Sequence, residues 1–336
     1  MFLSSKDKIR EKEFSIIFEP EHRSKVWKII EEKFHEYFNM IIKDACQSPV
    51  SEIDRLKKKF SNVSPSVNIG QYLDVEMSSE IENFEKTQKT YKNLFSKANI
   101  EEYASDTKLF RSDLKNECPV IRGLWNSKDE ELKKWKEAYK YSNDDELYEV
   151  MANIVNFSHA YAKSMKKKQY GENDDYAKLN FDCLDGIKDD TEPDYGLVGV
   201  VGYGIMSIIM YHFYPQYFPL HLSGGIYALY FLSDKYEIGM PSKSSEFLMI
   251  DDSHWDGDMH FKMKHNYFYP YRLYTWYALR LYRLLKTECA KHNFTLDDAY
   301  RYVYLNSFCW DVCRRHTEEI RTMVGADEDP NKRFWY

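Results

Sequence analysis

Hydrophobic residues recur every three or four positions along most of the chain, with charged residues between them. In residues 20–45, Val26, Ile30 and Phe34 fall on one side of a helical projection. That spacing is typical of an amphipathic helix that buries one face. The same spacing predicts helices over five further ranges: 79–97, 128–139, 144–167, 271–292 and 300–324. We therefore expect a mainly α fold.

The alternating pattern of a β-sheet is nearly absent from the sequence. Residues 247–250 are a short apolar run that fits one strand of a small β ribbon. Residues 61–79 and 171–194 contain turn-forming residues and predict connections between helices. Residues 119–125 predict a short apolar loop.

One stretch, residues 195–233, contains no Asp, Glu, Lys or Arg, although 30% of the chain is charged. We expect it to form the buried centre of a C-terminal helical domain over residues 121–336, beside an N-terminal helical region over residues 1–120. The alternative is a membrane-spanning helix over residues 196–214, because a span needs about 20 apolar residues. Four glycines in the first nine positions of that range argue against it. We therefore expect no membrane partner.

Aromatic residues are frequent, with 28 Tyr, 20 Phe and 7 Trp among 336 residues. Tyrosine buries a ring while keeping a polar end, so it suits both helix packing and base stacking. The net charge of −7 excludes a protein wholly devoted to coating nucleic acid, but it allows a local basic face. Six cysteines without a Cys-x-x-Cys pair, and a first segment without a signal-peptide core, lead us to expect a cytoplasmic protein.

Gly202 and Gly204 flank Tyr203 at the start of a long apolar helical pattern. Two glycines one residue apart allow a tight turn whose backbone amides point outward, and such amides bind phosphate. We therefore expect Gly202, Tyr203 and Gly204 to contact nucleic acid. The alternative is that the glycines only let two helices pack closely, because glycine has no side chain to hold backbones apart.

Residues 195–233 resemble the helix-hairpin-helix of the DNA glycosylase superfamily, in which a glycine hairpin holds one DNA phosphate. Residues 214–220 resemble the loop that leads to the catalytic aspartate of those enzymes. The chain departs from the family because no acid occurs between Asp194 and Asp234, and Met206 stands where a lysine nucleophile would fall. The resemblance implies a glycosylase-like fold and phosphate binding without base excision. By analogy, it implies a component of a DNA-handling or antiviral defence assembly.

The helix predicted over residues 271–292 carries Arg272, Arg280 and Arg283. Arg280 and Arg283 are three residues apart and are therefore neighbours on one face. Lys167 lies at the end of an earlier predicted helix, where a lysine either complements the helix dipole or binds phosphate. Together these residues are the cationic surface to which we expect nucleic acid to bind.

A second group of chemically active residues follows the predicted strand. Its members have the side chains that bind divalent metal ions: Asp251, Asp252, His254, Asp256 and His260. A short apolar run with two aspartates at its end is one way in which metal-dependent nucleases present carboxylates. The alternative without a metal function is a solvated loop with aspartates in turn positions.

Three functions are therefore open at this point. The first is a nucleic-acid-binding protein with a glycosylase-like but non-excising fold. The second is a metal-dependent hydrolase or nuclease that uses the loop from Asp251 to His260, with a divalent metal as its only cofactor. The third is a helical subunit whose tyrosine-rich faces bind a protein partner.

Overall fold

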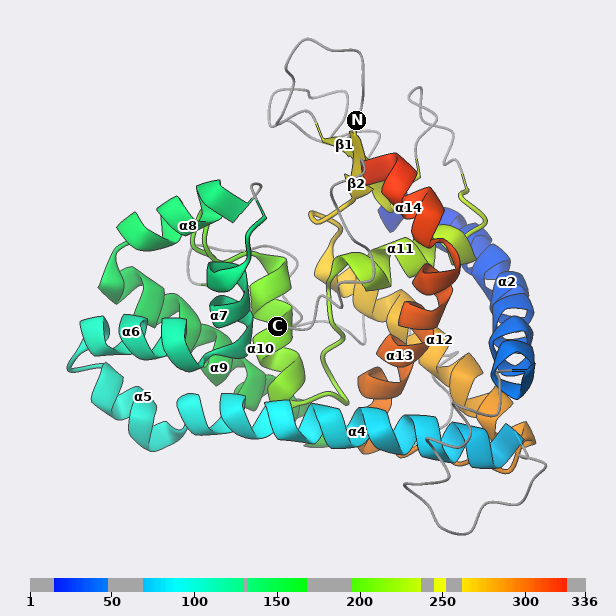
Figure 1. The fold of residues 1–336 in the computed structure, drawn as a ribbon, viewed down its shortest axis with the longest axis horizontal. Coiled ribbons are helices and arrows are strands. Elements are labelled where there is room, and N and C mark those ends of the chain that lie inside the picture. Colours follow the sequence, from blue (N-terminus) through cyan, green and yellow to red (C-terminus); the bar gives the residue numbers. More distant parts are fainter. Residues whose placement is uncertain are drawn as a thin grey trace.

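The computed structural model is mainly helical over the residues that it describes (Figure 1). These residues form twelve α-helices, two short 3-10 helices and one two-stranded antiparallel sheet. The mainly α prediction is therefore confirmed. The structure describes the following ranges: 15–47, 69–129, 132–167, 195–236, 245–251 and 262–324.

The described elements fall before and after the apolar stretch and within it. The first set is η1 (Ser15–Phe18), α2 (Pro20–Gln47), α4 (Ile69–Leu94), α5 (Lys97–Tyr103), α6 (Thr107–Glu117), α7 (Pro119–Asn126), α8 (Leu132–Tyr141) and α9 (Asp144–Lys167). The apolar stretch contains α10 (Tyr203–Phe213) and α11 (Ser223–Leu232). The last set is β1 (Leu248–Asp251), β2 (Lys262–His265), α12 (Tyr271–Lys291), η4 (Asp298–Tyr300), α13 (Arg301–Arg315) and α14 (Thr317–Val324).

Helix α4 joins two groups of helices. Figure 1 shows α4 running beneath both, with α5 to α10 on one side and α2 with α11 to α14 on the other. It begins at Ile69, so the predicted connection over residues 61–79 is wrong for its last part. Leu73 and Met77 are four residues apart and both buried, which extends the apolar face of the helix toward its N-terminus.

The same helix is part of the core and not only a cover. The sequence shows a thin apolar stripe on it, which by itself predicts a peripheral helix. Tyr91 and Leu94 are buried in the continuous hydrophobic core, and the Tyr91 hydroxyl accepts a hydrogen bond of 3.2 Å from the backbone amide of Val120. A thin stripe is enough because α4 is long and contacts several helices along its length.

Helix α7 replaces the apolar loop predicted over residues 119–125. Pro119 stands in the first turn, where its missing N–H has no helical partner to lose. Val120 and Ile121 of this helix are buried. The loop prediction is wrong because proline begins a helix here: its fixed φ suits the first turn.

The two helices of the apolar stretch are mostly buried, as its composition predicts, whereas Val198 before them is exposed. Helix α10 packs against α4 and α9, while α11 packs against α13 and α2. Each of the two groups of helices therefore contains one helix of the apolar stretch. The loop between them is held by α13, where the Arg301 guanidinium donates a hydrogen bond of 2.8 Å to the Gln216 carbonyl. Within the described part of the chain, no helix has both the length and the apolar character to cross a membrane.

The C-terminal part contains the predicted ribbon and a divided last helix. Strands β1 and β2 pair in antiparallel register from Leu248 opposite His265 to Asp251 opposite Lys262. The predicted single helix over residues 300–324 is wrong, because α13 ends at Arg315 and α14 begins at Thr317.

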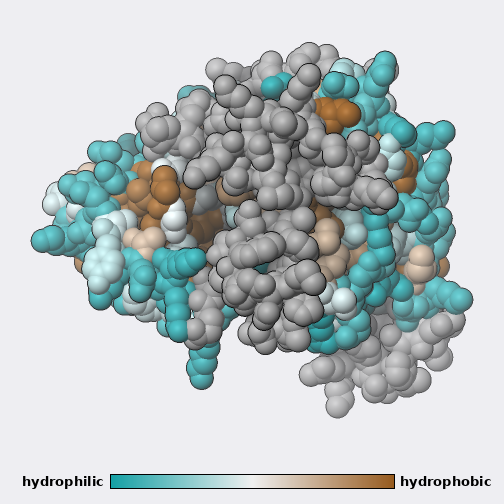
Figure 2. All heavy atoms as spheres, turned by 90° about the horizontal axis from the view of Figure 1, so that it is seen from above, coloured by the Kyte–Doolittle hydropathy of each residue, from teal (hydrophilic) through white to brown (hydrophobic). Residues whose placement is uncertain are grey.

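Seen from above, the described surface is mainly hydrophilic with small separate hydrophobic patches (Figure 2). The division into regions at residue 120 stays a prediction.

Candidate functional site

The glycine pattern begins α10, as predicted. Before it, the chain makes a tight turn in which the Val200 amide donates to the Leu197 carbonyl at 2.8 Å. Gly199 turns the backbone there with φ +75°, a conformation that favours glycine. Gly202 is the N-cap of α10 and has extended backbone angles, and no acidic residue lies in the first turn. The helix dipole at this end is therefore not compensated by a carboxylate of its own first turn.

Neither glycine is needed for close packing of helices. A Cβ atom added at Gly202 would meet nothing within 4 Å, and one at Gly204 would lie 3.5 Å from Leu222 Cδ2, an ordinary van der Waals distance. The close-packing alternative is therefore wrong for these two positions. Residues 168–194 lie outside the described residues, so the structure does not describe a helix that would complete a helix-hairpin-helix on the N-terminal side.

The three arginines of α12 lie on one side of that helix. At 3.6 residues per turn, Arg272, Arg280 and Arg283 fall within about 80° of one another, with Trp276 among them. All three arginines are half-buried. The periodicity of the helix therefore brings together the three arginines that were predicted to form a cationic surface.

Helix α2 adds aromatic and basic side chains to this side of α12. The Arg280 guanidinium carbon lies 4.1 Å from the ring centroid of Trp276 and 5.5 Å from that of Trp27. The Arg23 guanidinium carbon lies 5.8 Å from the Trp276 centroid, from the other helix. We define the Arg–Trp face by six residues: Arg23, Trp27, Arg272, Trp276, Arg280 and Arg283.

Like charges meet on the Arg–Trp face. Burial lowers the pKa of Arg280, and the neighbouring charges of Arg283 and Arg23 lower it further, while Glu31 opposes the shift. A pKa lowered by neighbouring cations means that the cations repel each other. An anion bound on this face would relieve that repulsion.

The structure does not place the glycine turn on the Arg–Trp face. Arg280 faces α2 through Trp27, whereas the Val200 carbonyl beside the glycine turn accepts a hydrogen bond of 2.9 Å from the Trp135 indole of α8. Figure 1 shows α10 and α2 apart, with α12 and α13 between them. Lys167 is the last residue of α9, and its side chain lies outside the described residues.

The predicted metal site lies almost wholly outside the described residues. Asp251 ends β1, and its side chain is not described. Asp252, His254, Asp256 and His260 belong to the range 252–261, which the structure does not describe. Over the ranges that it does describe, no three His, Cys, Asp or Glu side chains are grouped so as to hold a metal ion. The divalent metal stays a prediction.

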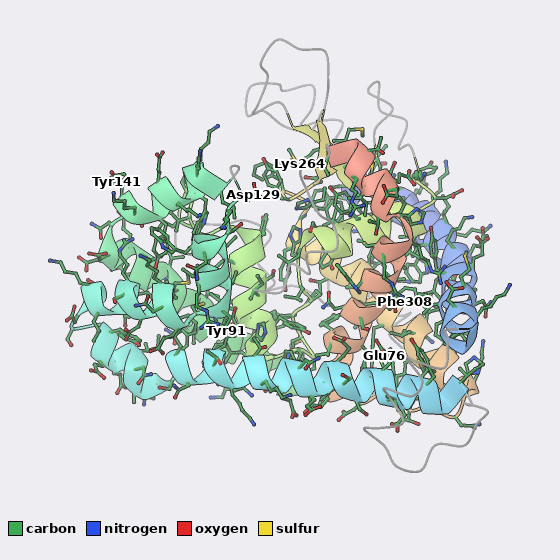
Figure 3. All side chains as sticks on the ribbon, in the orientation of Figure 1. Glu76, Tyr91, Asp129, Tyr141, Lys264 and Phe308 are labelled. Atoms are coloured by element: carbon green, nitrogen blue, oxygen red, sulfur yellow. The ribbon has the colours of Figure 1, made fainter. Side chains whose placement is uncertain are left out.

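A pocket of about 650 Å³ lies where α4 passes α7 and α10. Figure 3 shows Tyr91 close to this crossing. Two helix faces form its walls and α10 its floor, with Val303 of α13 at one end. The other lining residues are Glu80, Asn83, Phe84, Lys86, Thr87 and Thr90 of α4, Pro119, Arg122, Gly123 and Asn126 of α7, and Tyr211 and His212 of α10. We call it the central pocket.

His212, on the floor of the central pocket, has a fixed ring orientation and a single neutral tautomer. Its ring is stacked between Phe84, at 5.5 Å and 15°, and Tyr91, at 4.2 Å and 17°. Burial lowers the pKa of His212 to about 4, so the ring is neutral near pH 7. Nδ1 is 2.8 Å from the Ile208 carbonyl, which only accepts, so Nδ1 carries the proton and Nε2 is an acceptor.

Sequence reasoning did not identify the central pocket. Its polar lining residues follow helical spacing on α4 and α7, a pattern that equally fits an exposed face. An uncharged stretch that contains His212 was the only local signal. That signal identifies a buried histidine but not its neighbours.

A buried hydrogen bond links the N-terminal helix to the segment before the ribbon. His22 Nε2 of α2 lies 3.0 Å from Glu246 Oε2, and the Glu246 residue is only 1% exposed. Burial raises the pKa of Glu246, and the hydrogen bond with His22 opposes that shift. The Glu246 backbone carbonyl accepts from the Asn266 side-chain amide at 3.0 Å, which ties the pair to the end of β2. We call these two residues the His–Glu pair.

The chain was compared with known proteins at three levels. No family model, no curated protein and no solved structure matches it. The resemblance of residues 195–233 to the glycosylase superfamily therefore stays a prediction.

Proposed function

We propose that this protein binds nucleic acid on the Arg–Trp face. The observation that carries the proposal is that two guanidinium groups from different helices, Arg23 and Arg280, approach the single indole of Trp276. Stacking on an indole fixes the plane of a guanidinium and leaves its N–H edge suited to a phosphate. A third arginine, Arg283, lies one turn further along α12.

The aromatic component favours a single strand over a duplex. Trp27 is half-buried beside the arginines, and its ring meets that of Trp276 edge to face at 6.4 Å. Unpaired bases stack on such rings, while the bases of a duplex are covered by their own neighbours. Binding would therefore combine a few phosphate contacts with stacking, which suits a protein whose net charge is −7.

A role in a DNA-handling or antiviral defence assembly extends this proposal by analogy with the glycosylase superfamily. That likeness also nominates Gly202, Tyr203 and Gly204 as a second phosphate contact, without excision chemistry. The open space at Gly202 supports an approach of a ligand to the backbone. The distance of this turn from α2 in Figure 1 means that one strand would have to cross the molecule to reach both places.

The test is a salt titration of binding to fluorescently labelled single-stranded DNA, duplex DNA and single-stranded RNA, measured by anisotropy. With three or four phosphate contacts, the logarithm of the association constant should fall with the logarithm of salt at a slope of about −2 to −3. Arg283→Gln should weaken binding to a single strand and make the slope shallower by about 0.7 for each phosphate that is no longer bound. Arg280→Gln should do the same.

The matched control is Lys291→Gln on the same helix, because Lys291 is paired with Glu288 and lies about 12 Å beyond Arg283 along the helix axis. It should leave both affinity and slope unchanged. If Arg280 serves only to join α2 to α12, Arg280→Gln will lower the melting temperature and Arg283→Gln will leave binding unaltered. Failure to bind any of the three probes at low salt would reject the proposal and leave the partner-binding subunit as the function to pursue.

The glycine turn has its own test. Gly202→Val should cost at most about 1 kcal/mol of stability, because the added side chain meets open space and the backbone angles are extended. If the amides of α10 bind phosphate, the same change should reduce affinity for DNA at least tenfold by blocking approach to the backbone. Gly224→Ala in the first turn of α11 is the control, since a Cβ there also meets nothing within 4 Å. Unchanged affinity would remove the glycine turn from the interface.

A further inference from the structure

We infer that the central pocket is a binding site for a nucleoside monophosphate. The pocket lies between α4, α7, α10 and α13, whereas the Arg–Trp face lies on α2 and α12. The inference is therefore independent of the proposed nucleic-acid binding. It rests on the size of the pocket, on the state of His212 and on the arrangement of polar and cationic side chains along the two walls.

The walls are two helix faces that meet over a common space. On α4 the lining residues Asn83, Thr87 and Thr90 recur at four and three residues, and on α7 Arg122 and Asn126 are four apart. Side chains at these spacings share one side of a helix, so each wall presents a polar row to the other. A volume of about 650 Å³ lies within the range of about 300–1,000 Å³ that is usual for small-molecule sites.

These polar rows suit a ligand that both donates and accepts hydrogen bonds. The amides of Asn83 and Asn126 and the hydroxyl group of Thr90 each combine donor and acceptor atoms, while the Thr87 hydroxyl donates to the Asn83 backbone carbonyl at 3.2 Å and can still accept. The edges of a nucleobase and the hydroxyl groups of a ribose present the same mixture. An apolar ligand would leave these groups without partners, at a cost in affinity.

His212 supplies a fixed acceptor at the floor. Because Nδ1 donates to the Ile208 carbonyl and the ring is neutral, Nε2 accepts a hydrogen bond but cannot give one. The rings of Phe84 and Tyr91 on either side keep the imidazole from rotating. A rigid acceptor favours a ligand with an N–H donor, such as an exocyclic amino group or a ring imide, and its orientation costs nothing on binding.

The cations of the pocket suit one phosphate group and no more. Arg122 is exposed on α7 and, within the described ranges, forms no ion pair. Lys86 on the opposite wall is paired with Glu82 at 3.3 Å, and the carboxylate of Glu80 lies on the same wall. One guanidinium binds one phosphate in a bidentate manner. A diphosphate or triphosphate would meet the Glu80 carboxylate without a second unpaired cation, among the described lining residues, to balance it.

The experiment is isothermal titration calorimetry of the full chain with AMP, GMP, CMP and UMP, with the corresponding nucleosides, and with inorganic phosphate. We expect at least one monophosphate to bind saturably, at least tenfold more tightly than its nucleoside or phosphate alone. Arg122→Gln should weaken that monophosphate at least tenfold and leave the nucleoside unchanged. Asn126→Ala, at an exposed position of α7, should weaken both monophosphate and nucleoside.

The control is Lys89→Gln, because Lys89 is an exposed lysine of α4 that does not line the pocket. It should leave binding of the monophosphate unchanged. Arg283→Gln, on the Arg–Trp face, should also leave it unchanged, which separates this site from the proposed nucleic-acid interface. The inference is overturned if none of the four monophosphates binds at millimolar concentration. It is also overturned if binding survives both Arg122→Gln and Asn126→Ala, or if phosphate alone binds as tightly as the nucleotide.

Discussion

Replacing His22 by alanine is expected to lower the free energy of unfolding by about 3–5 kcal/mol, because it leaves the Glu246 carboxylate buried without its partner. Without His22, Tyr277 of α12 is the remaining side chain that interacts with the Glu246 carboxyl group, and it holds the pKa of Glu246 down less than His22 does. Urea unfolding at pH 7.5 measures the loss.

The stability lost in His22→Ala should increase with pH, because the pKa of Glu246 is raised. Burial raises this pKa above the ordinary 4.5, so the stability that its protonated form contributes is fully present below pH 4.5 and is lost as pH rises through the folded-state value. Without His22, which opposes the shift, the folded-state pKa rises further. His22→Ala should therefore be closest to the wild type near pH 4.5 and furthest from it at pH 7.5.

Two comparisons make this prediction specific to the His–Glu pair. The double variant His22→Ala with Glu246→Gln should recover part of the stability and lose the pH dependence, because the amide carries no charge to bury. His35→Ala is the matched control: His35 lies on the same helix and contacts Glu288 at 3.2 Å, but its side chain is 46% exposed. It should change stability by less than about 1 kcal/mol. A loss below about 1 kcal/mol for His22→Ala would contradict the prediction.

Gly225→Ala should destabilise the protein by about 1–3 kcal/mol, since the site has no room for a methyl group. A Cβ at Gly225 would overlap the Tyr274 hydroxyl, lie 2.9 Å from its Cζ atom and lie 3.3 Å from the Leu220 carbonyl oxygen. Tyr274 is buried in the core on α12, and its ring contacts His221 at 5.2 Å, so it has little freedom to move aside. Thermal unfolding followed by circular dichroism measures the effect.

The neighbouring glycine provides the control for Gly225. At Gly224 an added Cβ meets nothing within 4 Å, so Gly224→Ala should be neutral or stabilise α11 by up to about 1 kcal/mol through helix propensity. Combining Gly225→Ala with Tyr274→Phe should recover part of the loss, because the overlapping hydroxyl is removed. Equal stability of Gly224→Ala and Gly225→Ala would show that α11 and α12 do not approach as closely as the structure has them.

Gly225 is the glycine that permits the close approach of α11 and α12. The sequence pattern drew attention to Gly202 and Gly204, where alanine would fit. Gly225 lies in a less distinctive Ser-Gly-Gly sequence, and nothing local separates it from Gly224. Only the position of Tyr274 on a later helix makes one glycine necessary and the other replaceable.

Local periodicity was sufficient where a helix has a broad apolar face. Helix α9 has the predicted bounds, and α2 and α12 differ from prediction by only a few residues. The same periodicity places Arg272, Arg280 and Arg283 on one side of α12. Such features depend on residues within a few turns of each other, so the sequence carries them directly.

Periodicity was insufficient where an element is stabilised by distant partners. The beginning of α4 follows a stretch with turn-forming residues and contains Gly70, and burial of Leu73 and Met77 in the common core stabilises its helical state. Helix α7 is only eight residues long, and a helix of that length is marginal without tertiary packing. The break at His316 also has a tertiary setting, because its ring stacks on Phe231 of α11 with centroids 3.7 Å apart.

By itself, the sequence determined the mainly α class, the most regular helices, the buried centre and the common side of the three arginines. Tertiary structure decided that Trp27 meets Trp276, that His22 meets Glu246, and that α4, α7 and α10 enclose the central pocket. The reason is physical. Helical periodicity repeats within a few residues and is written in the order of side chains, whereas a contact between helices depends on how whole faces fit together after the chain has folded.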